Sequence, residues 1–473
     1  MDRKKIENCL RTGLVFLFIF FSCNPEQKPG NEIPDWANSI NEQVKTWVDT
    51  KSVLSADLLI IRNNKTILHN VYGCNDIDEN IPLEKNRLFR VHSMTKPFTG
   101  TAVLILAEEG KLDIEDKVSK YLAAYQNDKC QDITIRQLLE HTAGFTQPAY
   151  PKGSIDLYNS LEEAVTDLAG HGPKYTPGKE YHYSDGHSAS LGLIVTKVSG
   201  VPVEQFIQER IFAPLGMTDS YCLLEDGKPD RERVCDTYYW KEGKYQKLWD
   251  NHDKPETPFF RASGGIITTV EDYAKFLALW LNKGGENGVQ LLSEPTVLEA
   301  LSTNNIHNTY GWHWEIYQAS SNPDSLPVFG HGGSSGTLAI AVPEENTMIF
   351  YFTQSRGTLT ANFLSTFILE ELGYVEKKNI PGIKLSEKTV QKYTGEFLIG
   401  KETWTVEPTK NGLCLKSGRL VPIEFLPVSD SVFVQRFMDM KLEFMTNAKD
   451  SCHKFIFNID KRKIEATRVL NKK

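Results

Sequence analysis

Apolar positions in the middle of the chain recur at steps of three and four residues. Such spacing places apolar side chains on one face of an α-helix, so it predicts a largely helical middle region. The segments with this period are residues 98–109, 134–141, 159–169, 186–199, 202–213 and 270–282. Amphipathic helices are also expected near the two ends of this region, at residues 40–48 and 360–373.

Two other regions show the apolar runs that strands produce. Residues 58–73 contain two such runs around Asn63 and Asn64, which predicts a β-hairpin. Residues 336–354 give two more apolar strands around the turn sequence PEEN. Helices and hairpins together predict an α+β body, which we place at residues 39–378.

The pattern of apolar and polar residues changes after about residue 380. Short alternating stretches such as YTGEFLI and HKFIFNID are interrupted there by Gly, Pro and Asp. Short strands separated by turn residues predict a small, separate β domain, which we place at residues 379–473.

The N-terminus combines a basic start with the apolar stretch LVFLFIFF, which is short for a membrane span and typical of an export signal. We expect a signal peptide at residues 1–22. Its end resembles the lipobox of bacterial lipoproteins, which predicts cleavage before Cys23 and lipidation of this cysteine. Phe20 and Phe21 depart from that pattern, so an uncleaved anchor stays open. Either form predicts an exported, membrane-anchored protein of the bacterial periplasm or cell surface, with residues 23–38 as a polar, lipidated linker.

Composition excludes some classes of partner. The chain has 473 residues, and 53 Lys and Arg against 61 Asp and Glu give a net charge of −8 without a basic cluster in the body. A nucleic-acid partner would lack its usual electrostatic attraction, so we expect none. The eight cysteines show no CxxC or Cys/His spacing, so no metal and no other cofactor is expected. In an exported protein some of these cysteines are candidates for disulfides.

The stretch RVHSMTKPFTG at residues 90–100 carries the candidate chemistry. Pro97 is tolerated in the first turn of a helix but not in its interior, so the helix should begin close to Ser93. Free N–H groups and the positive end of the helix dipole would then favour an alkoxide or oxyanion there. Lys96 lies three residues on, on the same face, where its amine can reach the serine hydroxyl.

A Ser-x-x-Lys spacing also arises by chance, and the chain contains a second copy. Ser451 and Lys454 in SCHK lie in an alternating stretch, where residues three apart point to opposite faces of a strand. We interpret that copy as accidental. For SMTK alone, a capping serine beside a solvated lysine explains the residues equally well.

Further motifs follow SMTK along the chain. They are LLEHTAGF at 138–145, YHYSDGHSASLGLIVTKVSG at 181–200, ASGGIITTVEDYAKF at 262–276, YGWHW at 310–314 and HGGSSG at 331–336. Their order resembles the penicillin-binding, class C β-lactamase-like family of serine hydrolases over roughly residues 40–375. The resemblance implies a β-lactamase/transpeptidase-like fold, with an antiparallel sheet, flanking helices and a helical subdomain around one cleft. The tail resembles the small β-barrel domains that such hydrolases often carry.

The resemblance assigns roles by position. Ser93 would be the nucleophile, Lys96 its activating partner, and Tyr183 the tyrosine that relays a proton between the serine and the leaving group. Tyr125 in YQN fits the family's Tyr-x-Asn element letter for letter, but it precedes LLEHTAGF, and Tyr181 is expected to be a packing aromatic.

Positions 331–334 would form the strand that faces the substrate. His331 is expected at the catalytic cleft, and Gly332 and Gly333 would allow a substrate to approach the backbone closely. The N–H groups of Ser334 and Ser93 would form the oxyanion hole.

Two residues depart from the family pattern. Asp185 stands at a substrate-binding position where asparagine is usual, and its charge should hold Lys96 protonated if the two are close. From this we hypothesise that Tyr183 is the working base and Lys96 a cation that stabilises its phenolate. His331 replaces a lysine, so the strand offers less charge to a substrate carboxylate, which favours ester or amide substrates over efficient β-lactam turnover. The alternative is that His331 only caps a strand.

Several other residues receive a structural interpretation first. His141 and His187 are interpreted as polar residues at helix ends, and the aromatic stretch at 238–253 either lines the mouth of the cleft or forms a solvated hairpin.

The sequence as a whole predicts an exported serine hydrolase that acts through a Ser93 acyl-enzyme on an ester, amide or peptide bond of a small-molecule or peptide substrate. The alternatives are a D,D-peptidase or D-aminopeptidase on cell-wall peptides, a non-catalytic cell-wall-binding module of the same fold, and a surface lipoprotein whose β tail does the work.

Overall fold

We describe the protein from a computed structural model, which covers residues 33–469 except 79, 225–228, 304–305, 321, 323–324, 381–382 and 460–461. The predicted signal peptide at 1–22 and the lipidation site at Cys23 lie outside these residues. No helix of the described part is long and apolar enough to cross a membrane. The six cysteines of the described part are unpaired.

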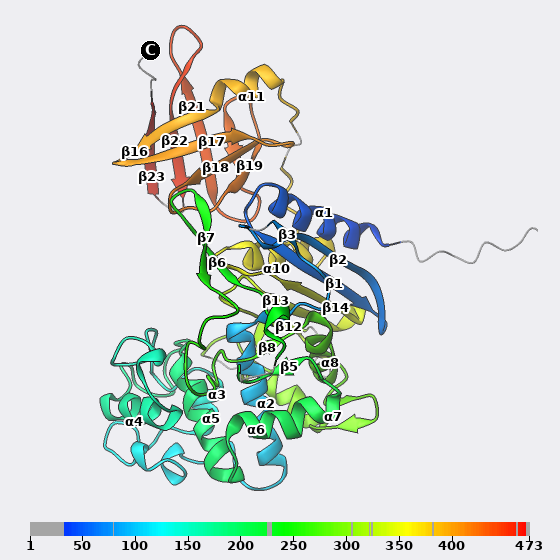
Figure 1. Ribbon diagram of the computed structural model, residues 1–473, viewed down its shortest axis with the longest axis vertical. Coiled ribbons are helices and arrows are strands. Elements are labelled where there is room, and N and C mark those ends of the chain that lie inside the picture. The colour runs from blue at the N-terminus through cyan, green and yellow to red at the C-terminus, as the bar shows by residue number, and fades with distance from the viewer. Residues whose placement is uncertain are drawn as a thin grey trace, which may run out of the picture.

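A seven-stranded antiparallel sheet forms the centre of the molecule, in the order β11-β12-β13-β14-β1-β2-β3 (Figure 1). Its strands are β1 (Ser55–Arg62), β2 (Lys65–Asp76), β3 (Ile81–Pro82), β11 (Glu315–Gln318), β12 (Val328–Gly332), β13 (Leu338–Val342) and β14 (Thr347–Phe352). The predicted hairpin is β1–β2, and Asn63 and Asn64 make its turn with positive φ angles of 51° and 58°. The second predicted hairpin is β13–β14.

Helices cover both faces of the sheet, which explains why β14 is buried at every position. Phe350 and Phe352 pack into a large core with the helical region, whereas Ile349 and Tyr351 pack on the opposite face. The helices of that opposite face are α1 (Asp35–Asp49) and α10 (Thr360–Glu371).

The helical region packs on the other side and is the lower part of Figure 1. Its helices are α2 (Lys96–Glu108), α3 (Ile135–Leu139), α4 (Leu161–His171), α5 (Asp185–Ser199), α6 (Val203–Ile207), α7 (Ala213–Leu215), α8 (Val270–Leu281) and α9 (Glu294–Ala300). The predicted periods match these elements with three differences. Helix α9 was not among the predicted segments. A π-helical turn at Gln208–Phe212 separates α6 from α7, and α1 begins five residues before the predicted 40–48 segment because Pro34 precedes a first turn that opens with Asp35.

Small sheets connect these layers. They are β4-β8-β5, made of Phe89–Arg90, Ile267–Thr268 and Ser220–Tyr221; β15-β6-β7, made of Ser355–Arg356, Thr237–Lys241 and Lys244–Trp249; and β9-β10, made of Gly285–Glu286 and Val289–Gln290. The hairpin β6–β7 contains the aromatic stretch at 238–253. Three of its aromatic side chains, Tyr238, Tyr245 and Trp249, are buried, whereas its turn at 241–244 is exposed, so the hairpin is only partly solvated. That it lines the mouth of the catalytic cleft stays a prediction.

The C-terminal part is a closed β-barrel, as the tail's texture and the family resemblance predicted. Its strands are β16 (Gly395–Ile399), β17 (Glu402–Pro408), β18 (Leu413–Ser417), β19 (Ile423–Pro427), β20 (Val432–Val434), β21 (Met440–Thr446), β22 (Cys452–Ile459) and β23 (Arg462–Arg468), preceded by α11 (Glu387–Tyr393). Inward-facing side chains such as Phe397, Phe425, Phe433 and Phe455 fill the barrel. Its centre is therefore a packed core.

Candidate active site

Ser93 lies where two helical segments meet. A short 3₁₀ turn spans His92–Thr95, and α2 continues it from Lys96 with Pro97 in its first turn, as the sequence predicted. The Ser93 side chain is partly exposed, whereas Lys96 is 0% exposed. The hydroxyl is thus open to a substrate, while the amine that contacts it is enclosed by protein.

The Lys96 ammonium group has three partners. Its Nζ atom lies 3.2 Å from Ser93 Oγ, 2.7 Å from Asp185 Oδ1 and 3.0 Å from the carbonyl oxygen of Ser263. The carbonyl belongs to the glycine-rich segment that begins at Ala262, and the carboxylate belongs to the first turn of α5. Three separate parts of the chain therefore hold the amine next to the serine.

Tyr183 is the third side chain that lies next to the Ser93 hydroxyl and the Lys96 amine. Its ring centroid lies 4.6 Å from Lys96 Nζ, and its hydroxyl shares a hydrogen bond with Ser93. Burial, together with the negative charge of Asp185, raises the pKa of Tyr183 well above 10. The side chain is therefore a phenol at ordinary pH, which argues against our hypothesis that its phenolate is the working base. A phenol at this position is a proton donor and relay.

Asp185 and Lys96 form an ion pair in which the lysine is fully buried and the Asp185 side chain is 24% exposed. Burial lowers the pKa of Lys96, and the carboxylate of Asp185 opposes this effect. Burial would raise the pKa of Asp185, but the charge and hydrogen bond of Lys96 hold it below its ordinary value. The two groups are 2.7 Å apart, so the condition that the sequence interpretation set for an effect of Asp185 on Lys96 is met.

The strand β12 brings the HGGSSG segment next to the nucleophile. Gly333 packs so tightly on this region that an added Cβ would lie 2.3 Å from the carbonyl oxygen of Val91, two residues before Ser93. The Ser335 hydroxyl donates to the carbonyl oxygen of Arg90 at 3.3 Å. Ser334 is exposed on the turn between these two contacts, beside the N-terminal end of the Ser93 segment, and its role in an oxyanion hole stays a prediction.

His331 and Gly332 differ in their access to a substrate. His331 is 1% exposed, and its Nδ1 and Nε2 atoms lie 2.7 Å from the carbonyl oxygen of Gly332 and 3.1 Å from the Tyr310 hydroxyl. Burial lowers the pKa of His331, so the ring is neutral. This geometry favours a supporting role for His331. Gly332 is partly exposed, and the nearest atom to an added Cβ would be 3.7 Å away.

The competing residues lie elsewhere. Tyr125 is 0% exposed in the core, with its hydroxyl 2.7 Å from Ser190 Oγ. Tyr181 stacks on His307 with ring centroids 3.8 Å apart, so it is a packing aromatic as expected.

The comparisons with known proteins agree with this geometry. The family model described as Beta-lactamase matches residues 40–372, which is most of the chain. The chain belongs to the beta-lactamase family.

Relatives within the beta-lactamase family match over different lengths. A protein of Escherichia coli strain K12 named "Putative D-alanyl-D-alanine carboxypeptidase" is 28% identical over 62% of this chain and 77% of its own length. A penicillin-binding protein of Bacillus subtilis strain 168 is 24% identical over 88% of this chain and 96% of its own. The structure of an octameric penicillin-binding protein homologue from Pyrococcus abyssi covers 92% of this chain and all of its own, with a TM-score of 0.64 and 22% identity. The fold and the hydrolase class of this beta-lactamase family member are thereby shown.

Behind the family's tyrosine lies a histidine cluster that the sequence interpretation missed. His141, His187 and His313 are each 0% exposed, and the Nδ1 atoms of His141 and His187 lie 2.6 Å apart, so one of the two rings donates to the other. The His141 ring is 4.6 Å from that of Tyr183. His141 and His187 do lie near helix ends, but neither faces solvent. His141 packs against Tyr183, and His187 packs against His141 and Phe145. The sequence feature that could have indicated this cluster is that His141 and His187 lie inside the motifs LLEHTAGF and YSDGH.

A group of arginines beside the nucleophile was also missed. Arg90, Arg261 and Arg356 surround Glu256, with nitrogen to carboxylate distances of 3.0, 3.1 and 3.9 Å. Three cations around one anion leave a net positive charge, and Arg261 adds to the effects that lower the pKa of Lys96. These residues come from three separate segments, since Glu256 and Arg261 are only five residues apart, so no local motif marks the whole group.

Proposed function

We propose that this protein is an exported serine hydrolase that forms an acyl-enzyme at Ser93 with an ester, amide or peptide substrate. The observation that supports the proposal is the meeting of Ser93, Lys96, Asp185 and Tyr183 around one partly exposed hydroxyl.

In the proposed reaction, Ser93 Oγ attacks the carbonyl carbon of the substrate while its proton passes to Lys96. The oxyanion of the tetrahedral intermediate accepts hydrogen bonds from the N–H groups of Ser93 and Ser334. The bond to the leaving group then breaks as that group takes up a proton through the Tyr183 hydroxyl. Water releases the acyl group by the same steps, and Ser93 regains its proton.

The Lys96–Asp185 pair supplies the base in this scheme. Ammonium with carboxylate and amine with carboxylic acid have the same total charge, and a poorly hydrated site reduces the advantage of the charged form. A proton on Asp185, 2.7 Å away, leaves Lys96 as a neutral amine 3.2 Å from Ser93 Oγ. The asparagine usual in the family has no carboxylate to accept that proton.

The strand next to the nucleophile favours uncharged substrates. His331 stands where the family has a lysine, and its buried ring is neutral, so β12 provides no cation for a substrate carboxylate. We therefore propose simple esters and amides as the first substrate class.

A D,D-peptidase or D-aminopeptidase acting on cell-wall peptides is the second candidate. The excess positive charge of Arg90, Arg261 and Arg356 could receive a peptide carboxylate in place of the missing lysine. The name of the Escherichia coli relative points the same way.

One experiment separates these alternatives. A fluorophosphonate probe is expected to add its mass to the wild-type protein and not to the Ser93→Ala variant. Absence of an adduct on the wild type would favour a non-catalytic binding module. Relative turnover of nitrophenyl esters, cephalosporins and D-Ala-D-Ala peptides then ranks the substrate classes, and an ester preference is expected.

The membrane tether is a separate part of the proposal. The full-length protein, expressed in a bacterium, is expected to fractionate with membranes and to carry lipid at Cys23, whereas the Cys23→Ala variant is expected to carry no lipid. A wild-type protein without lipid would contradict the lipidated form.

A further inference from the structure

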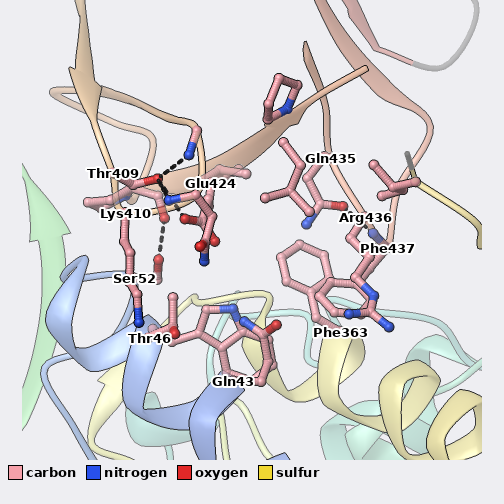
Figure 2. Close-up of a pocket in the computed structure, with 18 of the residues that line it drawn as sticks. Gln43, Thr46, Ser52, Phe363, Thr409, Lys410, Glu424, Gln435, Arg436 and Phe437 are labelled. Carbon is pink, nitrogen blue, oxygen red and sulfur yellow. Dashed lines mark hydrogen bonds between the residues drawn. The ribbon is translucent and has the colours of Figure 1, made fainter. Parts of the chain in front are cut away.

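A cleft of about 510 Å³ separates the barrel from the hydrolase domain, away from Ser93 (Figure 2). The hydrolase domain contributes the second half of α1 and the segment from Thr358 to Phe363. The barrel contributes the loop at 409–412, the segment at 421–427 and the segment at 435–437. A second cleft of about 710 Å³ shares Thr409 and Glu424 with the first, so Glu424 stands where the two meet.

One end of the first cleft is aromatic. Phe437 of the barrel stacks on Phe363 with ring centroids 5.4 Å apart, and Trp47 lies 6.2 Å from Phe437 and 6.4 Å from Phe363. These contacts fasten the barrel to α1 and α10. Phe437 is only partly buried, so its ring offers an apolar surface to a molecule in the cleft.

The opposite end is polar and is centred on Glu424. The Thr409 hydroxyl donates to Glu424 Oε1 at 2.7 Å and accepts from the backbone N–H of Gly412 at 2.9 Å, so the turn holds the carboxylate in place (Figure 2). Within the described part of the chain, no ion pair joins Glu424 to a lysine, arginine or histidine, and burial raises the pKa of this carboxyl. The other charged side chains that the structure describes in the lining of the cleft are Lys384, Lys410 and Arg436, and Arg436 is already paired with Glu370 at 3.1 Å.

Partial burial removes some of the water that would hydrate the Glu424 carboxylate, and the Thr409 hydroxyl is its one side-chain hydrogen-bond donor in the described residues. One neutral hydrogen bond does not make up the free energy lost by desolvating a charge. A cation in the cleft would supply both the missing charge and further hydrogen bonds. We propose that this cleft binds a small molecule with a protonated amine on an apolar or aromatic body, the amine at Glu424 and the body against Phe437. The binding itself does not depend on the chemistry at Ser93, whereas the effect on kcat described next rests on the proposed function.

The wall of the cleft also continues to the turn at 333–336, which carries Ser334. Thr358 lines the cleft, and its methyl carbon packs so closely on Gly336 that an added Cβ there would lie 2.4 Å away. The preceding residue, Gly357, donates its N–H to the carbonyl oxygen of Ser334 at 3.3 Å. An occupant of the cleft is therefore expected to change the kcat of ester hydrolysis at Ser93.

The test uses the full chain and three probes of similar shape and different charge, namely 2-phenylethylamine, 2-phenylethanol and 3-phenylpropionate. Isothermal titration calorimetry at neutral pH is expected to show the amine binding at least about tenfold more tightly than the alcohol, from the usual strength of a charged hydrogen bond. Equal affinity for amine and alcohol, or tighter binding of the anion, would overturn the site. This comparison needs no variant.

Substitutions locate the binding. Glu424→Gln keeps the shape of the side chain and is expected to remove the preference for the amine over the alcohol. Glu396→Gln, on an exposed position of β16, is the matched control and should leave it intact. Retention of the preference in Glu424→Gln would contradict the assignment. A saturating amine that leaves kcat unchanged would overturn the proposed link between the cleft and the turn that carries Ser334.

Discussion

The chain contains the Ser-x-x-Lys spacing twice, at Ser93 and Lys96 and at Ser451 and Lys454. The two copies differ in backbone conformation, burial and contacts. Ser93 and Lys96 lie at the start of a buried helix, where their side chains meet at 3.2 Å. Ser451 and Lys454 lie at the start of β22, and Lys454 Nζ contacts Glu465 on the neighbouring strand at 3.0 Å. The spacing brings the groups together only where the backbone is helical.

The two lysines also differ in burial and in their hydrogen-bond partners. Lys96 is fully enclosed and has a carboxylate and a carbonyl oxygen as partners. The Lys454 side chain is 28% exposed in a surface ion pair. An enclosed amine can exchange its proton with a neighbour, whereas a solvated one stays an ordinary cation.

The largest contrast is expected from removing the two serine hydroxyls. Ser93→Ala should lower kcat/KM for a nitrophenyl ester by more than about 10³-fold, since the nucleophile is lost. Ser451→Ala is the matched control and should stay within twofold of the wild type. Initial rates measure both, and comparable activity of the two variants would break the comparison.

The two lysines should differ nearly as much. Lys96→Met is expected to lower kcat by about 10²- to 10⁴-fold, the usual range for a positioned acid–base group. Lys454→Met loses only a surface ion pair, with an expected change of about 0–1 kcal/mol in the free energy of unfolding and none in kcat. Turnover and urea unfolding of both variants provide the measurement. An active Lys96→Met variant would exclude the lysine as part of the base.

A third contrast concerns the two candidate tyrosines. Tyr183→Phe should lower kcat by about 10²-fold or more, because the leaving group loses its proton source. Tyr125→Phe removes a buried hydroxyl that contacts Ser190, so it should cost about 1–2 kcal/mol of stability and leave kcat nearly unchanged. Thermal unfolding and turnover together tell a catalytic tyrosine from a structural one. A loss of kcat in Tyr125→Phe at full stability would contradict the assignment.

The smallest expected effect is a shift along the pH axis. In the wild type, Lys96 and Asp185 share one proton, and the pair can no longer accept the Ser93 proton once both groups are protonated. Because Lys96 holds the pKa of Asp185 below its ordinary value, this second protonation occurs only at low pH. After Asp185→Asn, Lys96 must lose its own proton, and even strongly depressed buried lysines titrate near roughly pH 5–6. The acidic limb of kcat/KM should therefore move to higher pH by more than about one unit. An unchanged limb would show that Asp185 does not carry the proton.

Much of the fold and part of the candidate site could be predicted from the sequence. Pro97 fixed the start of α2, and the Asn63–Asn64 turn and the PEEN turn marked the hairpins, because these features depend on local backbone preferences. The meeting of Lys96 with Asp185 followed from the motif order that resembles the family. The histidines at 141, 187 and 313 and the arginines around Glu256 could not be predicted in the same way. They come together only through tertiary packing of segments more than forty residues apart.

The most direct test maps the acylated residue in the wild-type protein. Trypsin should release residues 91–111 as one peptide, because Pro97 protects the bond after Lys96, and Ser93 is its only serine. The peptide at residues 450–454 contains Ser451. After treatment with a slowly released ester or a fluorophosphonate, the added mass is expected on Ser93 alone. Added mass on the 450–454 peptide, or on neither peptide, would contradict the account.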